Sequence, residues 1–393
     1  MSGGRLSILE LRSVRGTGGG PEKTILFGTE RTDRSRFAVT VCYLRDLRDP
    51  VFGIDDRARQ LNIDYVEILE RHSFDPGIWR KLSALVRERQ IDIVHSHDYK
   101  TDLLALMLAR RLGVITLSTA HGWTGQSARE RYVYYPAGKR LLARFPHVIA
   151  VSSDIRNELM RHGMDARRIT VILNAIDPEA FVRVDAKRDV VRRGLGLRPN
   201  DFVVGAVGRL ERQKRFDVLL EAFAPLARSR PDLRLVIVGD GSLRGELAAQ
   251  VTTLGLDASC VLAGHRLDIA ELHNAFDLFV QSSEYEGTPN AVLEAMAMST
   301  PIVATDVGGT AELAADEVHA LLVPPHDVGA LRAAIERVPT DPDGARTRAA
   351  AARRRIETEL SFDARTRCLE RLYEQLARDR TDVGATRGVP HHA

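Results

Sequence analysis

Short apolar runs rich in β-branched residues alternate with longer segments of helical periodicity from Leu6 to Leu322. This alternation predicts βαβ units that build parallel sheets. The strands expected in the first half are residues 6–9, 38–43, 65–68, 91–95, 115–119, 148–151 and 170–173. A second series is expected at 202–207, 233–238, 260–262, 278–281, 302–304 and 320–323. Helices such as 75–89, 101–111, 216–228, 243–254, 269–274 and 328–338 are expected between them.

The two series predict two domains, each an α/β, Rossmann-like, doubly wound parallel sheet. Residues 176–200 lie between the series and crowd Asp, Arg and Lys around Pro and Gly, the composition of a boundary segment with a hinge. We therefore expect an N-terminal domain over 1–175 and a C-terminal domain over 176–360. A helical stretch at 344–359 and an amphipathic segment at 362–377 follow, and residues 379–393 are predicted to be a disordered tail.

Composition narrows the functional classes. The 393-residue chain is 44% hydrophobic, and its 56 Lys and Arg against 53 Asp and Glu leave a net charge of +3, too small to indicate a nucleic-acid partner. Its three cysteines are odd in number and far apart, so neither a disulfide framework nor a Cys-based metal site is expected. The first ten residues lack the apolar core of a signal peptide, and no apolar window is long enough for a membrane span. These features predict a cytoplasmic protein.

The segment from Glu286 to Glu294 sets two carboxylates across a loop-to-helix junction. Thr288 is a candidate N-cap and Pro289 suits the first helical position. The amides of the first turn would favour a phosphate beside Asn290, while Glu294 can reach nearby hydroxyls. The alternative is an ordinary capped amphipathic helix with one surface Glu.

Gly208 and Arg209 follow the strand at 202–207, and Lys214 lies five residues further on. In α/β domains, ligands bind at the carboxyl ends of the strands. Gly208 would permit close backbone approach, and Arg209 and Lys214 together would neutralise a diphosphate. Solvated surface charge is the alternative interpretation.

The loop Gly16-Thr17-Gly18-Gly19-Gly20-Pro21 follows the first strand and precedes a helix. Adjacent glycines allow a ligand to come close to the backbone, and Pro21 suits the first helical position. The loop is neither a Walker motif nor the spaced dinucleotide-binding fingerprint, so nucleoside triphosphatase and dehydrogenase functions lose their best support. A merely flexible loop is the alternative.

Several other polar residues also follow strands. His121 follows the strand at 115–119 and is expected to face a cleft between the domains, although a lone His is often structural. His95, His97 and Asp98 lack a spaced third ligand, so we expect cleft-lining or structural roles and no metal site. Asp341-Pro342-Asp343 is typical of a turn, which also argues against a catalytic metal.

Three glycine-containing turns complete the set. Gly239-Asp240-Gly241 and Gly264-His265-Arg266 follow successive strands and are candidates for lining a nucleotide base pocket, or are simply tight turns. Gly308-Gly309-Thr310 follows another strand and would contact the donor or the acceptor.

Together these residues give the chain a resemblance to the retaining family-4 glycosyltransferases with the GT-B fold. The resemblance covers nearly the whole chain, is strongest from residue 202 to 322, and depends on order and spacing because each element alone is common. It is carried by the Gly-rich N-terminal loop, His121-Gly122, Gly208-Arg209 with Lys214, Gly239-Asp240-Gly241, the segment 283–297, Pro301 and Gly308-Gly309.

The resemblance implies roles for single residues. Arg209 and Lys214 would bind the donor diphosphate, Glu286 would hold hydroxyls of the donor sugar, Glu294 would bind the ribose, and His121 would contact the transferred sugar. Further donor contacts are expected at Gly19, Gly20, Gly208, Gly239, Asp240, Arg266, Thr288, Pro289 and Asn290. A final helix over 361–378 would return to the N-terminal domain. The two domains would face each other across a cleft, with the donor bound by the C-terminal domain.

The implied reaction is transfer of a sugar, with retention and without a metal or other cofactor, from a UDP- or GDP-linked donor to a glycan, lipid-linked or small-molecule hydroxyl. Thr288-Pro289-Asn290 stand where many relatives have an aromatic residue and a Gly, so the sugar is not inferred. The alternatives are a sugar-nucleotide epimerase and a catalytically silent scaffold that binds nucleotide sugars. Residues 128–145 carry basic and Tyr side chains that suit peripheral contact at the cytoplasmic face of a membrane, or an ordinary solvated helix.

Overall fold

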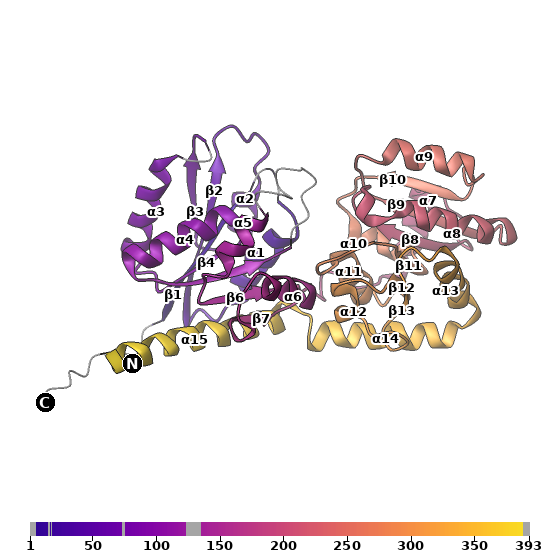
Figure 1. The fold of residues 1–393 in the computed structure, drawn as a ribbon. Helices are drawn as coiled ribbons and strands as arrows, with labels where there is room; N and C mark the ends of the chain where they lie inside the picture. Colours follow the sequence, from indigo (N-terminus) through magenta and orange to yellow (C-terminus); the bar gives the residue numbers. More distant parts are fainter. Residues whose placement is uncertain (1–4, 15, 17, 73–74, 123–134, 388–393) are drawn as a thin grey trace, which may run out of the picture. The chain divides into compact units, whose positions relative to one another are not determined.

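The chain forms two compact units in the computed structural model, which describes residues 5–14, 16, 18–72, 75–122 and 135–387 (Figure 1). The first unit comprises Met1–Asn174 and Phe362–Ala393, and the second comprises Ala175–Ser361. Each unit contains one parallel sheet with helices.

The sheet of the first unit has the order β3-β2-β1-β4-β5-β6-β7, and each strand pairs in parallel with its neighbours. Its strands are β1 (Leu6–Ser13), β2 (Phe37–Asp46), β3 (Tyr65–Glu70), β4 (Ile93–Ser96), β5 (Ile115–Ala120), β6 (His147–Ala150) and β7 (Ile169–Val171). Its α-helices are α1 (Gly20–Arg31), α2 (Ile54–Gln60), α3 (Pro76–Glu88), α4 (Tyr99–Leu112), α5 (Tyr135–Leu142), α6 (Ser153–Arg161) and α15 (Phe362–Arg387). The strand order reverses between β1 and β4, which is where doubly wound folds bind ligands.

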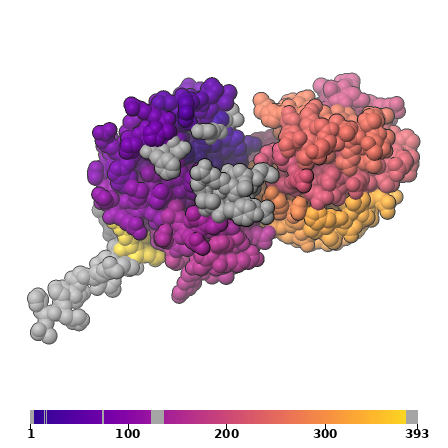
Figure 2. All heavy atoms as spheres, turned by 45° about the horizontal axis from the view of Figure 1, so that its top comes forward, coloured from indigo at the N-terminus to yellow at the C-terminus, as the bar shows by residue number. Residues whose placement is uncertain are grey.

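Strand β1 shows how the sequence builds this layered fold. Leu9 and Leu11 belong to the core cluster that also contains side chains of α3 and α4. Ile8 points to the opposite face, where it joins the cluster that contains Leu372 and Tyr373 of α15. Alternate residues of a strand face opposite sides, so both faces of this sheet are covered. Figure 2 shows α15, in yellow, at the surface of the first unit.

The sheet of the second unit has the order β10-β9-β8-β11-β12-β13, again with parallel pairs. Its strands are β8 (Phe202–Val207), β9 (Leu233–Val238), β10 (Cys260–Gly264), β11 (Leu278–Gln281), β12 (Ile302–Thr305) and β13 (Leu321–Val323). Its α-helices are α7 (Asp185–Gly194), α8 (Phe216–Ser229), α9 (Arg244–Thr253), α10 (Ile269–Leu272), α11 (Asn290–Ala297), α12 (Gly309–Leu313), α13 (Val328–Thr340) and α14 (Pro342–Thr358). The order reverses between β8 and β11.

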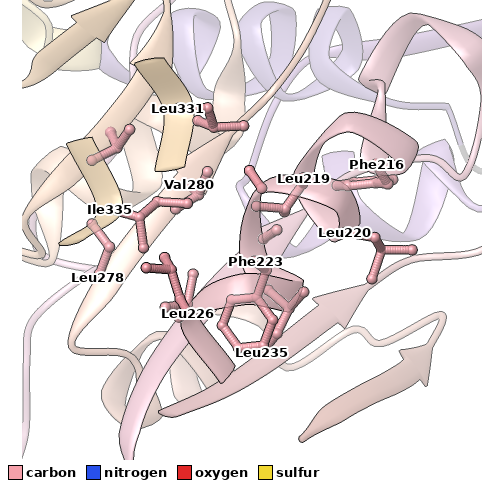
Figure 3. Packing of buried hydrophobic residues seen from close by; sticks show 14 of the residues in the cluster. Phe216, Leu219, Leu220, Phe223, Leu226, Leu235, Leu278, Val280, Leu331 and Ile335 are labelled. Atoms are coloured by element: carbon pink, nitrogen blue, oxygen red, sulfur yellow. The ribbon is translucent and has the colours of Figure 1, made fainter. Parts of the chain in front are cut away.

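Helix α8 holds the main core of the second unit. Figure 3 shows Phe223 and Leu226 of α8 among Leu235, Leu278 and Ile335, which come from β9, β11 and α13. All five side chains are buried, and area burial of this kind stabilises by about 1.5–3 kcal/mol for each large apolar side chain. This packing fixes the strands whose carboxyl ends carry the polar residues discussed below.

The chain passes from the first unit to the second between Asn174 and Ala175, directly before the predicted boundary segment of residues 176–200, and α7 lies within that segment. Arg192 of α7 is fully buried and donates to a carboxylate oxygen of Asp277 at 2.6 Å. The charged composition therefore belongs to a packed helix whose buried Arg is paired.

The prediction of a tail from residue 379 is wrong for residues 379–387, because α15 continues to Arg387. Residues 379–387 contain no Pro that would end the helix, and the next Pro in the sequence is Pro390. Residues 388–393 of the predicted tail, and residues 128–134 of the predicted membrane-contacting segment, lie outside the described residues.

Helix α5 begins at Tyr135, and Pro136 and Gly138 lie within it. Pro136 occupies the first turn, where its missing N–H costs no helical hydrogen bond. Among the described residues, no helix combines the length and the apolar character that crossing a bilayer requires.

Candidate functional site

Lys214 and Glu286 form the centre of the polar group at the carboxyl ends of β8 and β11. Lys214 ends a 3₁₀ turn (Arg212–Lys214) after β8, and Glu286 lies in the loop after β11. The Nζ atom of Lys214 donates to Oε1 of Glu286 at 2.5 Å, and Ser283 Oγ donates to the same oxygen at 2.6 Å. The two charged side chains are 18% and 6% exposed, so the pair is largely withdrawn from water.

Glycine contacts fix the backbone around this pair. A Cβ on Gly309 would lie 1.5 Å from the carbonyl oxygen of Gly287, and the Gly309 N–H donates to the Glu286 carbonyl at 3.2 Å. A Cβ on Gly239 would lie 1.9 Å from the Gly208 carbonyl oxygen, and Gly239 has φ of +146°. Only glycine fits such approaches, so these turns pack backbone against backbone.

Helix α11 begins one residue later than the sequence suggested. Pro289, not Thr288, is the N-cap residue, and Asn290 is the first helical residue. Thr288 does not cap because Pro289 is extended, with ψ of 108°, and the first helical bond runs from the Val292 N–H to the Pro289 carbonyl. The first-turn amides still belong to Asn290 and the residue after it, as a phosphate-binding helix start requires.

Both acidic residues of the 286–294 segment are buried, so the interpretation of Glu294 as a surface residue of an ordinary helix is wrong. Glu286 is 9% exposed and Glu294 is 8% exposed. An oxygen of Glu294 lies 4.0 Å from Nε2 of His273, which is fully buried. Burial lowers the pKa of His273 to about 3, so this ring is neutral at pH 7.

Other predicted donor contacts lie at the same edge of the second sheet but are exposed. Arg209 lies two residues after the end of β8, and its neighbour Leu210 donates an N–H to the carbonyl of Asp240 at 2.9 Å. The Asp240 carboxylate accepts the N–H of Gly241 at 2.9 Å. Arg266 is occupied by a two-contact pair with Asp268, at 2.8 and 2.5 Å, which the sequence did not indicate.

In the first unit, His121 lies at the end of a chain of hydrogen bonds that starts at a buried carboxylate. Oε2 of Glu10 lies 2.5 Å from Nε2 of His97, and Nδ1 of His97 lies 3.1 Å from Nε2 of His121. The other ring nitrogen of His121, Nδ1, is buried without a hydrogen-bond partner in the described residues. Burial holds the pKa of His121 well below its ordinary value and lowers that of His97 to about 4.

The second Glu10 oxygen is bound from α15 and β4. Tyr373 O–H donates to Oε1 of Glu10 at 2.7 Å, and Nδ1 of His95 lies 3.2 Å from the same oxygen. Nε2 of His95 lies 2.7 Å from Oγ1 of Thr119. Burial alone would raise the Glu10 pKa, but the two neighbouring His rings outweigh it and hold the pKa well below its ordinary value. Glu10 is therefore a carboxylate at neutral pH.

The carboxylate and the two rings, Glu10, His95 and His97, form a cluster whose ligand atoms lie within 4.8 Å of one another, which is close enough for a metal ion. Tetrahedral zinc, with ligands at about 2.0–2.1 Å, separates ligand atoms by about 3.3 Å. The 2.5 Å contact between Glu10 and His97 is a hydrogen-bond distance instead. Asp98 is not part of the cluster, because its side chain caps α4 through the N–H groups of Lys100 and Thr101.

A carboxylate of the chain itself binds the glycine loop at Gly19. Gly19 is the N-cap of α1, and its N–H donates to Oε2 of Glu22 at 2.5 Å. Glu22 is 1% exposed and also pairs with Arg12. Gly20 is the first helical residue, so Pro21 occupies the second position and not the first. The Gly19 amide is thus already bonded within the chain.

Sequence reasoning missed Glu10, Tyr373 and the pairing of His97. A signal was present for Glu10, because a carboxylate interrupts the apolar strand Leu-Ser-Ile-Leu-Glu-Leu. A charge at such a position needs a buried partner. Asp341, by contrast, caps α14 by accepting the Gly344 N–H at 3.0 Å, so the late Asp-Pro-Asp sequence begins a helix.

Comparison with known proteins identifies the family. The model of glycosyl transferases group 1 matches residues 187–355, and that of glycosyltransferase family 4 matches residues 18–180. The chain is 31% identical over 304 residues to an Escherichia coli UDP-Gal:α-D-GlcNAc-diphosphoundecaprenol α-1,3-galactosyltransferase, covering 71% of this chain and 77% of that protein. The chain belongs to glycosyltransferase family 4. It is an enzyme that transfers sugars.

Other relatives and solved structures agree with this assignment. The family 4 chain is 30% identical over 299 residues to glycogen synthase of Mycobacterium tuberculosis, covering 73% of this chain and 69% of that protein. The structure of Anabaena HepE in complex with UDP matches with a TM-score of 0.81 at 22% identity, covering 94% of this chain and all of that one. The HepE complex with UDP-glucose matches with a TM-score of 0.77 at 23% identity, covering 96% and 100%. The fold is GT-B, as the resemblance predicted.

Proposed function

We propose that this enzyme transfers a sugar, with retention of anomeric configuration and without a metal, from a nucleoside-diphosphate donor to an acceptor hydroxyl. The observation that carries the proposal is the part-buried Lys214–Glu286 pair at the carboxyl ends of β8 and β11. A cation and a carboxylate held together there suit a donor that joins a diphosphate to a polyhydroxylated sugar.

The residues divide between the two parts of the donor. Lys214 and the exposed Arg209 bind the diphosphate and stabilise the negative charge that develops as the glycosidic C–O bond breaks. Glu286 accepts hydrogen bonds from hydroxyls of the sugar. Glu294 binds the ribose hydroxyls, and the first-turn amides of α11 at Asn290 meet a phosphate oxygen.

UDP is the preferred nucleotide, with GDP as the alternative. HepE binds UDP and UDP-glucose in its solved complexes, and the E. coli relative uses UDP-Gal. Gly239, Asp240 and Arg266 follow β9 and β10 at the same sheet edge and contact the nucleotide. The sugar is a hexose, as in these relatives.

The acceptor is a hydroxyl of a glycan or a lipid-linked sugar. The E. coli relative is named for a diphosphoundecaprenol-linked acceptor, and the relative from M. tuberculosis is a glycogen synthase. Attack occurs on the face that the leaving diphosphate vacates, and the departing phosphate oxygen takes the acceptor proton. His121 contacts the transferred sugar, and we propose that the enzyme acts in the cytoplasm.

A donor panel with product analysis tests the proposal. UDP- and GDP-linked hexoses are first ranked by thermal shift, because a ligand that binds only the folded state raises the melting temperature. The best donor is then incubated with lipid-linked and soluble glycan acceptors in EDTA, and the anomeric coupling constant of the product is read by NMR. Transfer with retention is expected. An inverted product, activity that requires added metal, or conversion of the donor without an acceptor would contradict the proposal.

A further inference from the structure

Buried hydrogen bonds in the first unit determine which nitrogen of His121 carries the proton. Three groups form the chain: Glu10 on β1, His97 directly after β4 and His121 directly after β5. The two links measure 2.5 Å and 3.1 Å, and the His97 and His121 rings stack at 5.4 Å with an interplanar angle of 27°. Glu10 and His97 are buried, with exposed fractions of 5% and 6%.

The direction of each hydrogen bond follows from the carboxylate. Glu10 can only accept, so Nε2 of His97 must be the protonated nitrogen of that neutral ring. Nδ1 of His97 is then unprotonated and accepts a hydrogen bond from the protonated Nε2 of His121. A neutral His121 with its proton on Nε2 presents a bare lone pair at Nδ1. This nitrogen is the buried atom for which the described residues provide no donor.

A second set of groups holds the Glu10 carboxylate in its charged form. Tyr373 donates to Oε1 at 2.7 Å, and Nδ1 of His95 lies within hydrogen-bonding distance of the same oxygen. Arg365 of α15 is 5% exposed and interacts electrostatically with Glu10. Both Tyr373 and Arg365 come from the last helix, more than 350 residues away from Glu10 along the chain.

We propose that Glu10 and His97 are positioning residues that fix His121 as an acceptor-only imidazole, whose Nδ1 receives a hydrogen bond from a hydroxyl of the transferred sugar. The unsatisfied buried acceptor gains its missing donor when the sugar binds. The proposal rests on the proposed function only for the identity of this hydroxyl. The proton position itself is a property of the free protein.

The position of the proton is measured without any substrate. In the full-length protein labelled with ¹⁵N at histidine, long-range ¹H–¹⁵N correlation spectra distinguish the Nε2–H form, the Nδ1–H form and imidazolium. His121 is expected in the neutral Nε2–H form from pH 6 to pH 8. A protonated Nδ1 or an imidazolium in this range would overturn the proposal, whether or not sugar transfer has been observed.

Two variants that each replace a histidine by phenylalanine test the series of hydrogen bonds from Glu10 to His121. His97→Phe removes both hydrogen bonds, so His121 is expected to become a mixture of the two neutral forms. We expect kcat to fall by about 10-fold to 100-fold, by analogy with the partners that orient metal-binding histidines. His95→Phe removes a ring on the other side of Glu10 and is expected to leave the His121 form unchanged. His97→Gln, which can donate and accept, is expected to restore the Nε2–H form in part. An unchanged His121 spectrum in His97→Phe would refute the role of His97.

Two further outcomes separate this proposal from its rivals. Tight binding of one equivalent of zinc by the wild type, lost in His97→Phe, would overturn the proposal because the cluster would then be a metal site. If the Nε2–H form is observed but no nucleotide sugar is used, the proposed function fails and the assignment of His121 in the free protein stands.

Discussion

Replacing Glu286 by Gln tests whether this carboxylate and a bound diphosphate compete for Lys214. In the structure the Lys214 ammonium lies 2.5 Å from Oε1 of Glu286. Two oxygens that bind one ammonium at ordinary distances lie about 5 Å apart. At about 5 Å, two unit charges repel by about 1 to 3 kcal/mol for effective dielectric constants between those of water and of a protein surface site. The carboxylate should therefore weaken the binding of a diphosphate.

Glu286→Gln is expected to bind UDP about tenfold more tightly, because about 1.4 kcal/mol of repulsion is removed. The same variant should lose about 10-fold to 100-fold in kcat/KM for sugar transfer, because a charged acceptor for the sugar hydroxyls is lost. Titration calorimetry with UDP and an initial-rate transfer assay measure the two effects on the same preparation.

Ser283→Ala is the matched control for the Gln variant. Ser283 donates to the same Glu286 oxygen at 2.6 Å, so its removal deletes a hydrogen bond and leaves the charge in place. UDP affinity should stay within about twofold of the wild type. Weaker UDP binding by Glu286→Gln than by the wild type would refute the reasoning, because the carboxylate would then hold Lys214 in place for the diphosphate.

Three further changes have expected outcomes. Gly309→Ala places a Cβ 1.5 Å from the Gly287 carbonyl oxygen, so the loop carrying Glu286 must shift. The rate of sugar transfer should fall at least 100-fold. Gly329→Ala, at an exposed helix position, is the control and should keep the wild-type rate. Burial lowers the pKa of His97 from 6.5 to about 4, so its contribution to stability is complete above pH 6.5, and up to about 3 kcal/mol is lost as the pH falls toward 4. The melting temperature should therefore fall more steeply between pH 6.5 and pH 5 in the wild type than in His97→Gln. Parallel pH dependences of the two melting temperatures would contradict this. Tyr373→Phe removes the O–H bound to Glu10 and should lower the stability of the first unit by about 1.5–3 kcal/mol, measured by denaturation; no loss would show that this bond contributes nothing.

The sequence predicted the fold well because parallel strands buried on both faces are continuous apolar runs. The strands at 202–207, 233–238 and 278–281 were predicted at their observed bounds. Strand β1 was predicted to end at Leu9 but continues to Ser13, because its pairing with β2 extends to Leu44. Polar residues at 10 and 12 concealed this extension, and only the neighbouring strand shows that they belong to the sheet.

Helix α7 was missed for a related reason. Its sequence, DAKRDVVRRG, is so polar that it is typical of a boundary segment. The buried side chain that holds it is Arg192, whose partner Asp277 lies 85 residues away. A charged pair that forms between distant segments leaves no local pattern, whereas an apolar helix face does.

The candidate residues of the second unit could be proposed from sequence because they lie in the loops after predicted strands or in the first turns of the helices that follow. The contact of Lys214 with Glu286 is a consequence of β8 and β11 being neighbours, which strand order decides. The hydrogen bonds to Glu10 could not be predicted from the sequence, since they join residues that are 85, 87 and 363 positions apart. The roles of the predicted donor contacts stay predictions until ligand binding is measured.

The most direct test of the central proposal is to measure how tightly UDP binds when Arg209 or Lys214 is replaced. Titration calorimetry compares the wild type with Arg209→Met and Lys214→Met, and with Arg230→Met as a control. Arg230 precedes β9 at the amino ends of the strands, so its loss changes the net charge equally at the opposite edge. We expect UDP affinity to fall by about 10-fold to 100-fold in each of the first two variants, the range for a lost charge-assisted hydrogen bond, and by less than about twofold in the control. Equal affinity in all four proteins would contradict the assignment of the diphosphate to Arg209 and Lys214.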